Sequence, residues 1–463
     1  MVKLFLCLFS LVLLAACKLG PEYRRPSVEA PPDWRWKQAE PRDHVPRGEW
    51  WKVFNDPVLD QLQADAAAAN QELKAAMARV EQARATARFN RSDFFPSLNG
   101  TATYARYRTS GNAPSPVPFP VPSFTQTTWQ SPWDLTYEVD LWGKVRRGFE
   151  AAREQALGAD AARQFVLLTV QSDVAVNYLS LQSTFAEIEL LKKTIQIREE
   201  ALEIFRQRLA VGLGTEFEIQ RARVEVESAK ADLAAAEQRR AELLNALALL
   251  CGKAPSQFTV AVNTGLARLP EIAPDLPSSL LERRPDVAQA ERELAARNAQ
   301  IGIARTAYFP SLRLTASGGV LSGEFTDLFD WESRIWSIGP SFSIPVFSGG
   351  RAKSNLQRAQ AAYDEAVALY RQKILVAFRE VEDSLAALNH LREQLRARTE
   401  AAGAASNAAS LSFERYKAGA VNFLEIVDAE QARLANEVAR VRVANEQRLA
   451  TVRLIKALGG GWE

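Results

Sequence analysis

Two long segments of this chain carry an apolar residue at every seventh position, and this repeat constrains the fold more than any other feature. These residues are Leu167, Val174, Leu181, Ile188, Ile195, Leu202 and Leu209, then Val367, Ile374, Val381, Leu388, Leu395, Ala402, Ala409 and Tyr416. Neither 144–211 nor 352–418 contains a proline, so each is predicted to form one helix of roughly 100 Å. A sustained seven-residue stripe forms a seam against another helix, as in a coiled coil. The periodicity alone also fits a solvated coiled-coil rod.

The chain repeats its motifs in two halves. FFPSL at 94–98 returns as YFPSL at 308–312, and RLAVG ending at Gly212 returns as RYKAG ending at Gly419. DLWGKVR ending at Arg146 returns as PVFSGGR ending at Arg351. The distance between copies falls from 214 residues (94 to 308) to 205 (146 to 351), which leaves nine extra residues in the first half. The proline-rich stretch 109–125 is predicted to be the loop that contains them.

Each half is predicted to run helix, strand, loop, strand, very long helix, tight tip and long helix. The predicted strands are 98–108, 126–141, 312–321 and 335–346. The predicted divisions are an N-terminal segment 18–60, a first repeat 61–264 with a hairpin at 98–141, and a second repeat 265–463 with a hairpin at 312–346. The fold class is therefore α+β, with an internal two-fold repeat.

The strands alternate between apolar and polar residues. On the apolar side lie Trp129, Trp133, Tyr137, Trp336 and Phe342. Two hairpins with one apolar face and open edges are not stable alone in water. Lipid would cover the apolar face, but no strand edge can stay open in lipid, and four strands are too few for a membrane barrel. Three copies would supply twelve strands to one shared barrel, so we expect these five side chains to face lipid. The alternative is burial under a water-soluble lid.

The first residues predict export. MVKLFLCLFSLVLLAAC has one early positive charge and then an apolar run too short to span a bilayer, as in a secretory signal. Leu14-Ala15-Ala16-Cys17 resembles the lipobox of bacterial lipoproteins, which implies cleavage before Cys17 and acylation (palmitate among the chains) of that residue. Two or three acyl chains would anchor the protein without a transmembrane helix. The alternative is an ordinary signal peptide, 1–17, that ends near a chance cysteine.

Composition argues against several classes of function. The formal net charge of +2 gives no electrostatic case for nucleic acid. The three cysteines and two histidines fit neither a disulfide framework nor a metal site, so no cofactor or metal is expected. No nucleophile elbow, phosphate loop or metal-ligand cluster is present, and we predict that the protein is not an enzyme.

The motifs together resemble the TolC-like outer-membrane efflux proteins, in particular the lipid-anchored OprM-like (NodT-type) branch. The resemblance covers nearly the whole chain. It rests on both FPSL copies, DLWGKVR, PVFSGGR, Cys17 followed by KLGPEYRRP, WWKVFNDPVLDQL (50–62), LLERRPDVAQAE (280–291) and RYKAGAVNFLEIVDAE (415–430).

This resemblance implies a homotrimer, with a shared twelve-stranded barrel in the outer membrane and a long α-helical barrel in the periplasm. A mixed region near 251–284 and the chain ends would surround the helical barrel. The trimer would passively conduct small molecules, drugs or other toxic compounds, from an inner-membrane RND-type pump and a periplasmic adaptor to the exterior. Two alternatives remain: a duct for type I protein secretion, and a non-conducting structural coiled-coil lipoprotein.

The resemblance also implies functional positions at the periplasmic tips. Leu424 and Asp428 match the family's constriction, and three copies of Asp428 would form a ring of carboxylates. Some relatives carry an arginine three positions later, where this chain has Gln431, which argues against an Asp–Arg lock here. Gly212, Gly214 and Gly419 match the tips at which the adaptor docks. For each residue the ordinary explanation stays open: a solvated aspartate near a helix start, and glycines that end helices.

Overall fold

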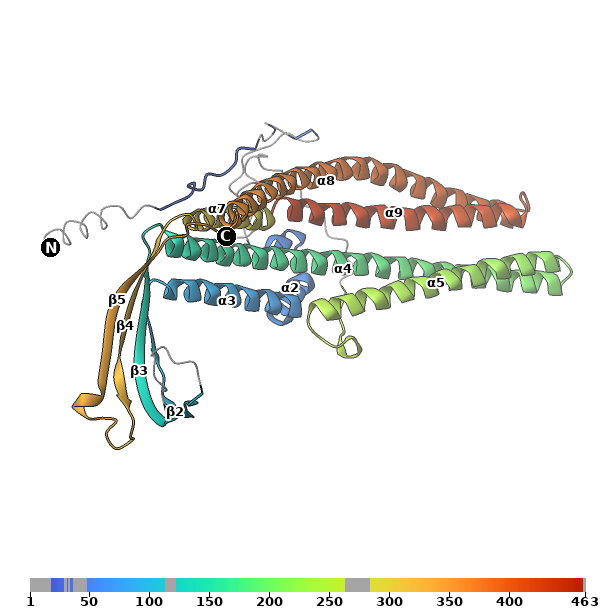
Figure 1. Ribbon diagram of the computed structural model, residues 1–463. Helices are drawn as coiled ribbons and strands as arrows, with labels where there is room; N and C mark the ends of the chain where they lie inside the picture. Colours follow the sequence, from blue (N-terminus) through green and yellow to red (C-terminus); the bar gives the residue numbers. More distant parts are fainter. Residues whose placement is uncertain are drawn as a thin grey trace. The chain divides into compact units, whose positions relative to one another are not determined.

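The computed structural model describes residues 18–28, 31, 34–35, 48–112, 122–262 and 284–460. Its helices and strands, drawn in Figure 1, are η1 (Trp50–Phe54), α2 (Pro57–Ala69), α3 (Gln71–Ser92), β1 (Ser97–Gly100), β2 (Thr103–Arg108), β3 (Thr125–Val139), α4 (Lys144–Ala210), α5 (Glu216–Leu250), η2 (Pro255–Gln257), α7 (Pro285–Thr306), β4 (Ser311–Ser322), η4 (Trp331–Ser333), β5 (Arg334–Ser343), α8 (Arg351–Lys417) and α9 (Phe423–Ala457). The predicted signal peptide 1–17, the predicted boundary at 264–265 and much of the mixed region near 251–284 lie outside the described residues.

The internal repeat is confirmed by matched helices. α3 and α7 each have 22 residues, α4 and α8 each have 67, and α5 and α9 each have 35. Gly143 and Gly350 stand directly before α4 and α8 and have left-handed φ angles of 80° and 83°, so they are the equivalent pair. These two glycines are 207 residues apart (143 to 350), whereas the FPSL copies are 214 apart, so the first half has seven extra residues. The prediction of nine extra residues, which came from matching Arg146 with Arg351, was wrong.

The chain forms two compact units, and each contains pieces of both halves. One comprises the described residues of Met1–Pro26 together with Glu81–Gly158 and Glu291–Leu369, and it contains the sheet. The other comprises the described residues of Ser27–Val80, Ala159–Ala290 and Tyr370–Glu463, and it contains most of the long helices.

A single antiparallel sheet joins the strands of both halves in the first unit. Its order among the described residues is β1-β3-β4-β5, and β2 also pairs with β3 (Figure 1). The strand predicted at 98–108 is interrupted at Thr101 and Ala102. Thr101 donates its N–H to the Pro132 carbonyl at 3.0 Å, but Pro132 has no N–H to return the bond. The strand predicted at 335–346 ends at Ser343.

The second unit confirms the predicted helix seams. Val174, Leu181, Ile374 and Val381 are all 0 % exposed, and none of the heptad residues is fully exposed. One apolar cluster joins η1, α2, α4, α5 and α9 around Trp50, Tyr178 and Leu247, among others. Another joins α8 to α9 and contains Val381 and Leu454. The helices are therefore held by packing of their apolar stripes, which is the main source of helix stability in folded proteins.

Two of the sequence motifs prove to be structural. In WWKVFNDPVLDQL the buried Asp56 carboxylate caps α2, and it also accepts hydrogen bonds from Tyr178 Oη at 2.9 Å and Gln182 Nε2 at 2.8 Å. In LLERRPDVAQAE the buried Arg284 guanidinium pairs with Asp286 at 2.9 Å and Glu380 at 2.6 Å. Both motifs therefore connect helices that are distant in the sequence.

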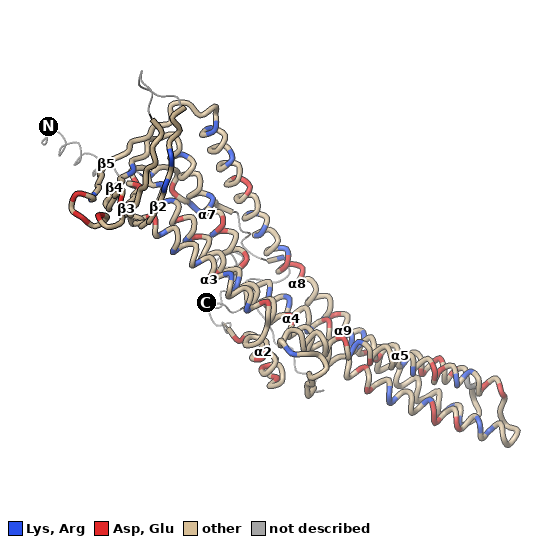
Figure 2. The backbone as a smooth tube through the Cα atoms, turned by 60° about the horizontal axis from the view of Figure 1, so that its bottom comes forward, with Lys and Arg blue, Asp and Glu red and all other residues tan. Residues whose placement is uncertain are grey.

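Charged residues occur along all the long helices, whereas the middle of the sheet has few (Figure 2). No helix in the described part of the chain combines the length and the apolarity needed to cross a membrane.

Candidate functional site

The sheet brings the predicted apolar residues together on one face. Trp133 and Trp336 both stand opposite Gly318 of β4, one on either side. Trp336 is 79 % exposed, and Trp133 and Phe342 are also exposed. Trp129 and Tyr137 lie on the same face but are half-buried. The Trp129 ring packs against the rings of Tyr104 and Phe325, with centroids 4.4 and 5.0 Å away. The register therefore confirms that these side chains share a face, and their contact with lipid stays a prediction.

The other face of the sheet is polar. Glu138 stands opposite Arg313, and its carboxylate forms an ion pair with Lys144 at 2.8 Å. Asp134 stands opposite Ser317, and Thr136 opposite Thr315. One face of the sheet thus suits an apolar medium and the other suits water.

The two tips have the same backbone design. Gly212 follows α4 with a φ of 76°, and Gly419 follows α8 with a φ of 71°. In each tip the N–H of the residue after the glycine bonds back to the last helical turn, from Leu213 to Arg208 and from Ala420 to Arg415, both at 2.9 Å. These bonds satisfy carbonyls that the helix end would otherwise leave unpaired.

Two different causes explain the three predicted docking glycines. A Cβ atom on Gly212 or Gly419 would meet nothing within 4 Å, so these two residues are required by their φ angles. A Cβ atom on Gly214 would lie 3.0 Å from the Leu209 backbone nitrogen, so close packing requires it. Helix ending accounts for Gly212 and Gly419 and close packing accounts for Gly214, and adaptor docking stays a prediction.

Both predicted gate residues lie on the first turns of α9, four positions apart. Leu424 is 42 % exposed, and Asp428 is also exposed. Next to them Glu425 is held by Arg415 at 2.8 Å, so its charge is paired. The structure places Leu424 and Asp428 on an accessible helix surface, as a gate would need, and leaves the gate itself a prediction.

Gln431 is occupied elsewhere. Its Nε2 donates to Glu225 Oε1 of α5 at 2.6 Å, and Glu225 is buried beside Arg198 of α4. Arg198 Nη1 lies 3.3 Å from Glu225 Oε2 and donates to the Glu225 backbone carbonyl at 2.6 Å. Three helices are thus joined below the tip by the Arg198–Glu225–Gln431 link.

We expect Glu225→Ala to loosen α9. The substitution leaves the Arg198 guanidinium buried without its carboxylate partner. Removing one partner of a buried ion pair lowers the free energy of unfolding by about 3–5 kcal/mol. Amide exchange around Gln431 should accelerate strongly when it is followed by mass spectrometry. The matched control is Glu227→Ala, whose exposed carboxylate lies 3.6 Å from Lys230 and should contribute about 0–1 kcal/mol. Equal exchange in both variants would contradict a stabilising role for the link.

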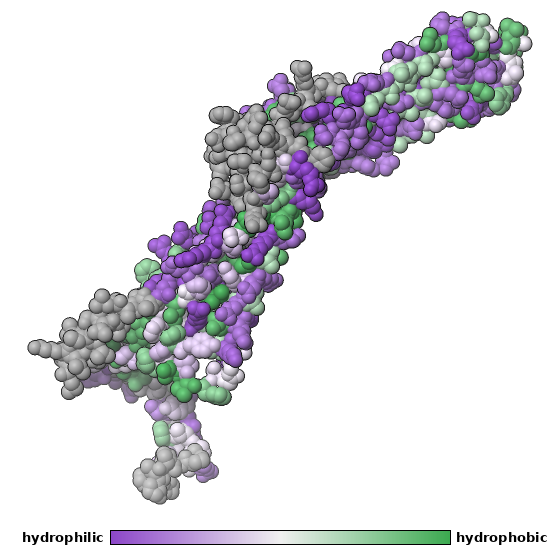
Figure 3. Space-filling model, turned by 90° about the horizontal axis from the view of Figure 1, so that it is seen from above, coloured by the Kyte–Doolittle hydropathy of each residue, from purple (hydrophilic) through white to green (hydrophobic). Residues whose placement is uncertain are grey.

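Apolar side chains at the first tip were not predicted from the sequence. Val211 and Leu213 are 70 % exposed and Phe217 is 67 % exposed, and hydrophobic atoms reach the surface among hydrophilic ones at the helix ends (Figure 3). Their signal was visible in the sequence as apolar residues around the glycines of AVGLGT, outside the heptad stripe. Contiguous exposed apolar patches mark surfaces that bind other proteins, and binding at this tip stays a prediction.

Metal-binding clusters and reactive thiols are not found among the described residues. No group of three His, Cys, Asp or Glu side chains among them lies close enough to hold a metal ion. The Cys251 thiol is buried, and burial raises its pKa to about 11, so it stays protonated at neutral pH.

Comparison with known proteins identifies the family. Residues 62–253 and 276–460 match the family model described as outer membrane efflux protein. The chain belongs to the outer membrane efflux protein family. Its function is therefore that of an outer-membrane efflux channel, and the family consists of transporters rather than enzymes.

Individual relatives match along almost their whole length. The outer membrane protein OprJ of Pseudomonas aeruginosa is 36% identical over 97% of this chain and 94% of its own. The toluene efflux pump outer membrane protein TtgI of Pseudomonas putida is 33% identical, with 98% and 97% covered. The cation efflux system protein CusC of Escherichia coli is 30% identical, with 97% of each covered.

Solved structures confirm the TolC-like fold. A membrane protein from Pseudomonas aeruginosa superposes with a TM-score of 0.87 at 35% identity, over 96% of this chain and 100% of the other. The CmeC outer membrane channel of Campylobacter jejuni superposes with a TM-score of 0.90 at 27% identity, over 96% of each chain.

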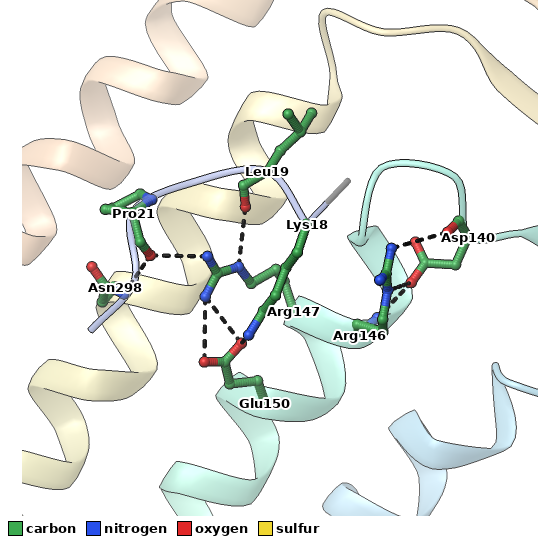
Figure 4. Close-up of polar contacts among 8 residues, drawn as sticks. All are labelled: Lys18, Leu19, Pro21, Asp140, Arg146, Arg147, Glu150 and Asn298. Carbon is green, nitrogen blue, oxygen red and sulfur yellow. Dashed lines mark hydrogen bonds and ion pairs between the residues drawn. The ribbon is translucent and has the colours of Figure 1, made fainter. Parts of the chain in front are cut away.

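In this efflux protein the residues directly after Cys17 are held by a clamp that the sequence did not reveal (Figure 4). Arg147 is only 1 % exposed and donates to the carbonyls of Leu19 at 3.1 Å and Pro21 at 2.9 Å. Asn298 also donates to the Pro21 carbonyl, at 3.0 Å, and Lys18 forms an ion pair with Glu150 at 2.8 Å. Cys17 itself lies outside the described residues.

Glycines make room for this clamp. A Cβ atom on Gly302 would lie 2.8 Å from both Arg147 Nε and the Leu19 carbonyl oxygen. Asp140 and Gly143 of DLWGKVR build the adjoining turn, where Asp140 accepts hydrogen bonds from the N–H groups of Val145 at 3.2 Å and Arg146 at 2.9 Å. The motif therefore starts α4 and, through Arg147 next to it, fastens the N-terminal segment.

We expect Gly302→Ala and Arg147→Ala to release residues 18–21. Gly302→Ala forces a clash with Arg147 and the Leu19 carbonyl. Arg147→Ala removes two hydrogen bonds from a buried charged group, and these two bonds contribute about 3–6 kcal/mol to the stability of the clamp. The measurement is amide exchange and protease cleavage of the segment around Leu19. The control is Gly148→Ala, whose Cβ would have only an ordinary contact at 3.8 Å. Equal protection of the segment in all variants would show that the clamp does not hold it.

Proposed function

We propose that this efflux protein is the lipid-anchored, homotrimeric exit channel of a tripartite pump. It passively conducts small toxic molecules from an inner-membrane RND-type pump and a periplasmic adaptor to the exterior. The observation that carries the proposal is the sheet, which combines one exposed apolar face with two outer edges, β1 and β2 on one side and β5 on the other, that face no further strand in the described chain.

The physics of the sheet supports a trimer. In lipid every backbone polar group must be paired, so a sheet of this size has to be closed by other copies. Since β1 and β2 are the two parts of one interrupted strand, each chain supplies four strands and three chains give twelve, which is within the range of known outer-membrane barrels.

The anchor is acylated Cys17, which becomes the first residue when residues 1–16 are cleaved off as the signal peptide. The clamp on Lys18, Leu19 and Pro21 supports it, because the chain is fastened immediately after the acylated residue. Two or more acyl chains provide a stable attachment to the membrane.

The gate is proposed at the tips, with three copies of Leu424 and Asp428 around the axis. The Asp428 carboxylates would attract cations and narrow the resting pore. Position 431 is a glutamine, which carries no charge and donates to Glu225, so no cation from that position neutralises Asp428.

The adaptor is proposed to dock on the two tips, at Gly212, Gly214 and Gly419 and on the exposed Val211, Leu213 and Phe217. TtgI is named for toluene and CusC for cations, so the class of cargo varies among relatives of similar identity. We therefore assign the choice of substrate to the pump rather than to this channel.

Gel migration of the protein extracted from outer membranes tests the proposal. We expect an unheated sample to run near three times the monomer mass and a boiled sample to run as the monomer, with metabolic palmitate label in the band. Expression in a strain without its own exit channel should restore resistance to small toxic compounds. A protein that is monomeric before boiling and absent from the outer membrane would refute the proposal.

A further inference from the structure

An apolar cavity lies between the four long helices of the second unit, close to the tips. Its volume is about 150 Å³, and its walls come from α4, α5, α8 and α9. The most buried residues of these walls are Phe205, Ala222, Ile426 and Val427. On the other side Ile204 is 44 % exposed, so the cavity has a buried floor and an opening to the surface.

The charged side chains of the cavity wall are already occupied. Two of the four belong to the Arg198–Glu225–Gln431 link. The other two are Glu200 and Glu430, and each accepts a hydrogen bond from a neighbour on its own helix, at 3.1 and 2.8 Å. Since every charged side chain of the wall has a protein partner, a ligand has to be recognised by the hydrocarbon surface.

Aromatic side chains make that surface suitable for a flat ring. The rings of Phe205 and Tyr416 meet edge to face, with centroids 6.2 Å apart and planes at 75°. Phe413 adds a third ring to the wall. Aromatic groups attract one another in such edge-to-face and offset arrangements, so a further ring would gain contacts beyond the burial of its area.

The volume limits the size of the occupant. Apolar cavities of roughly 150 Å³ that are lined by Leu, Ile and Phe stay dry and bind benzene. A helix with its side chains is about 10–12 Å across and does not fit into such a space. We propose that this cavity is a binding site for one small aromatic hydrocarbon of about six to eight carbon atoms. The competing occupant is a single apolar side chain of another protein chain.

A molecule in this cavity would contact α4 and α9 at the same time. On α9 the lining residues Ile426 and Val427 lie between Leu424 and Asp428 in the sequence. A ligand that fits this arrangement of helices stabilises it over any other, by mass action. Occupancy would therefore hold the first turns of α9 against α4. The inference concerns binding alone and does not depend on the proposed function.

Amide exchange of the full-length protein in detergent tests the site. Ethylbenzene should slow exchange severalfold in residues 197–205 and 424–430, because the bound ligand stabilises the contact between α4 and α9. Benzylammonium has nearly the same shape but carries a charge in place of the terminal methyl group, so it should have no effect at the same concentration. Detergent dissolves ethylbenzene equally in every sample, so differences between protein variants report on the site.

Two leucine substitutions give a matched pair. Ala201 lines the cavity, and Ala201→Leu should raise the concentration of ethylbenzene that is needed about tenfold or more, because the added carbons take the space of the ligand. Ala231→Leu makes the same change at an exposed position of α5 and should respond like the parent. Ile204→Ala provides a second measurement if Ala201→Leu does not fold. It enlarges the cavity at its exposed side and should shift the preference from ethylbenzene to naphthalene.

Three results would overturn the proposal. Unchanged exchange in the parent would mean that no hydrocarbon enters the cavity, as expected if a side chain of another chain fills it. Equal slowing in the parent and Ala201→Leu, or an unchanged preference in Ile204→Ala, would place the ligand elsewhere. Slowing by benzylammonium as strong as that by ethylbenzene would contradict an apolar site. Gel migration of the trimer is measured without any ligand, so the proposed function fails or stands separately.

Discussion

Replacing Ile338 by arginine is expected to prevent assembly in the outer membrane. Ile338 is 78 % exposed in the middle of β5, between Trp336 and Phe342 on the apolar face. An arginine facing the middle of a bilayer costs about 2–4 kcal/mol, so three copies in a trimer cost roughly 6–12 kcal/mol. That is comparable with the whole stability of many folded proteins, about 5–15 kcal/mol.

The neighbouring residue supplies the control. Ser337 lies on the opposite face of β5 and is exposed, so Ser337→Arg puts the same charge one position away on the polar face. We expect normal amounts of trimer from Ser337→Arg and almost none from Ile338→Arg on unheated gels of outer membranes. Equal amounts from both would mean that the apolar face is covered by something other than lipid, as the water-soluble lid requires.

Removing the Asp428 carboxylate is expected to open the resting pore. Purified protein in planar bilayers should show a small, cation-preferring conductance, and Asp428→Ala should raise the conductance severalfold and reduce the preference for cations. The physical reason is that a ring of three exposed carboxylates attracts cations that bridge and narrow the constriction. High salt should weaken the difference between the two proteins, because it screens exposed charges.

Two variants separate charge from size. Asp428→Asn removes the charge at nearly the same volume, so it should reproduce the effect of alanine if the charge closes the pore. Asp232→Ala removes an exposed carboxylate from α5 and should leave conductance unchanged. Equal conductance in the parent and Asp428→Ala would keep the channel and exclude Asp428 from its gate. If no variant conducts despite confirmed insertion, the channel itself is refuted.

The sequence predicted the periodic parts of the fold well. The stripe from Leu167 to Leu209 became the buried seam of α4, and the alternation around Trp133 became the two faces of β3. Both follow from the period of one local element, 3.6 residues in a helix and 2 in a strand. The repeated FPSL and glycine motifs likewise revealed the two matched halves, because each copy builds the same local turn.

The candidate site was predicted less completely. Leu424, Asp428 and the tip glycines were chosen by resemblance, and the structure explains the glycines by helix ending and close packing. The Arg198–Glu225–Gln431 link joins residues up to 233 positions apart (198 to 431), and nothing in the local pattern of any one of them indicates the others. The same holds for Arg147, whose motif was noticed although its partners Leu19 and Pro21 were not.

The amino-acid sequence by itself therefore determined which segments are helix or strand, which side of each is apolar, and that the chain is built twice. Only the tertiary structure decided that β3 pairs with β4 to join the halves, that Pro132 breaks the strand opposite it, and that Gln431 bonds to Glu225. The reason is physical. Periodicity depends on neighbours a few residues away, whereas strand register and buried polar pairs depend on which distant side chains packing brings within hydrogen-bond distance.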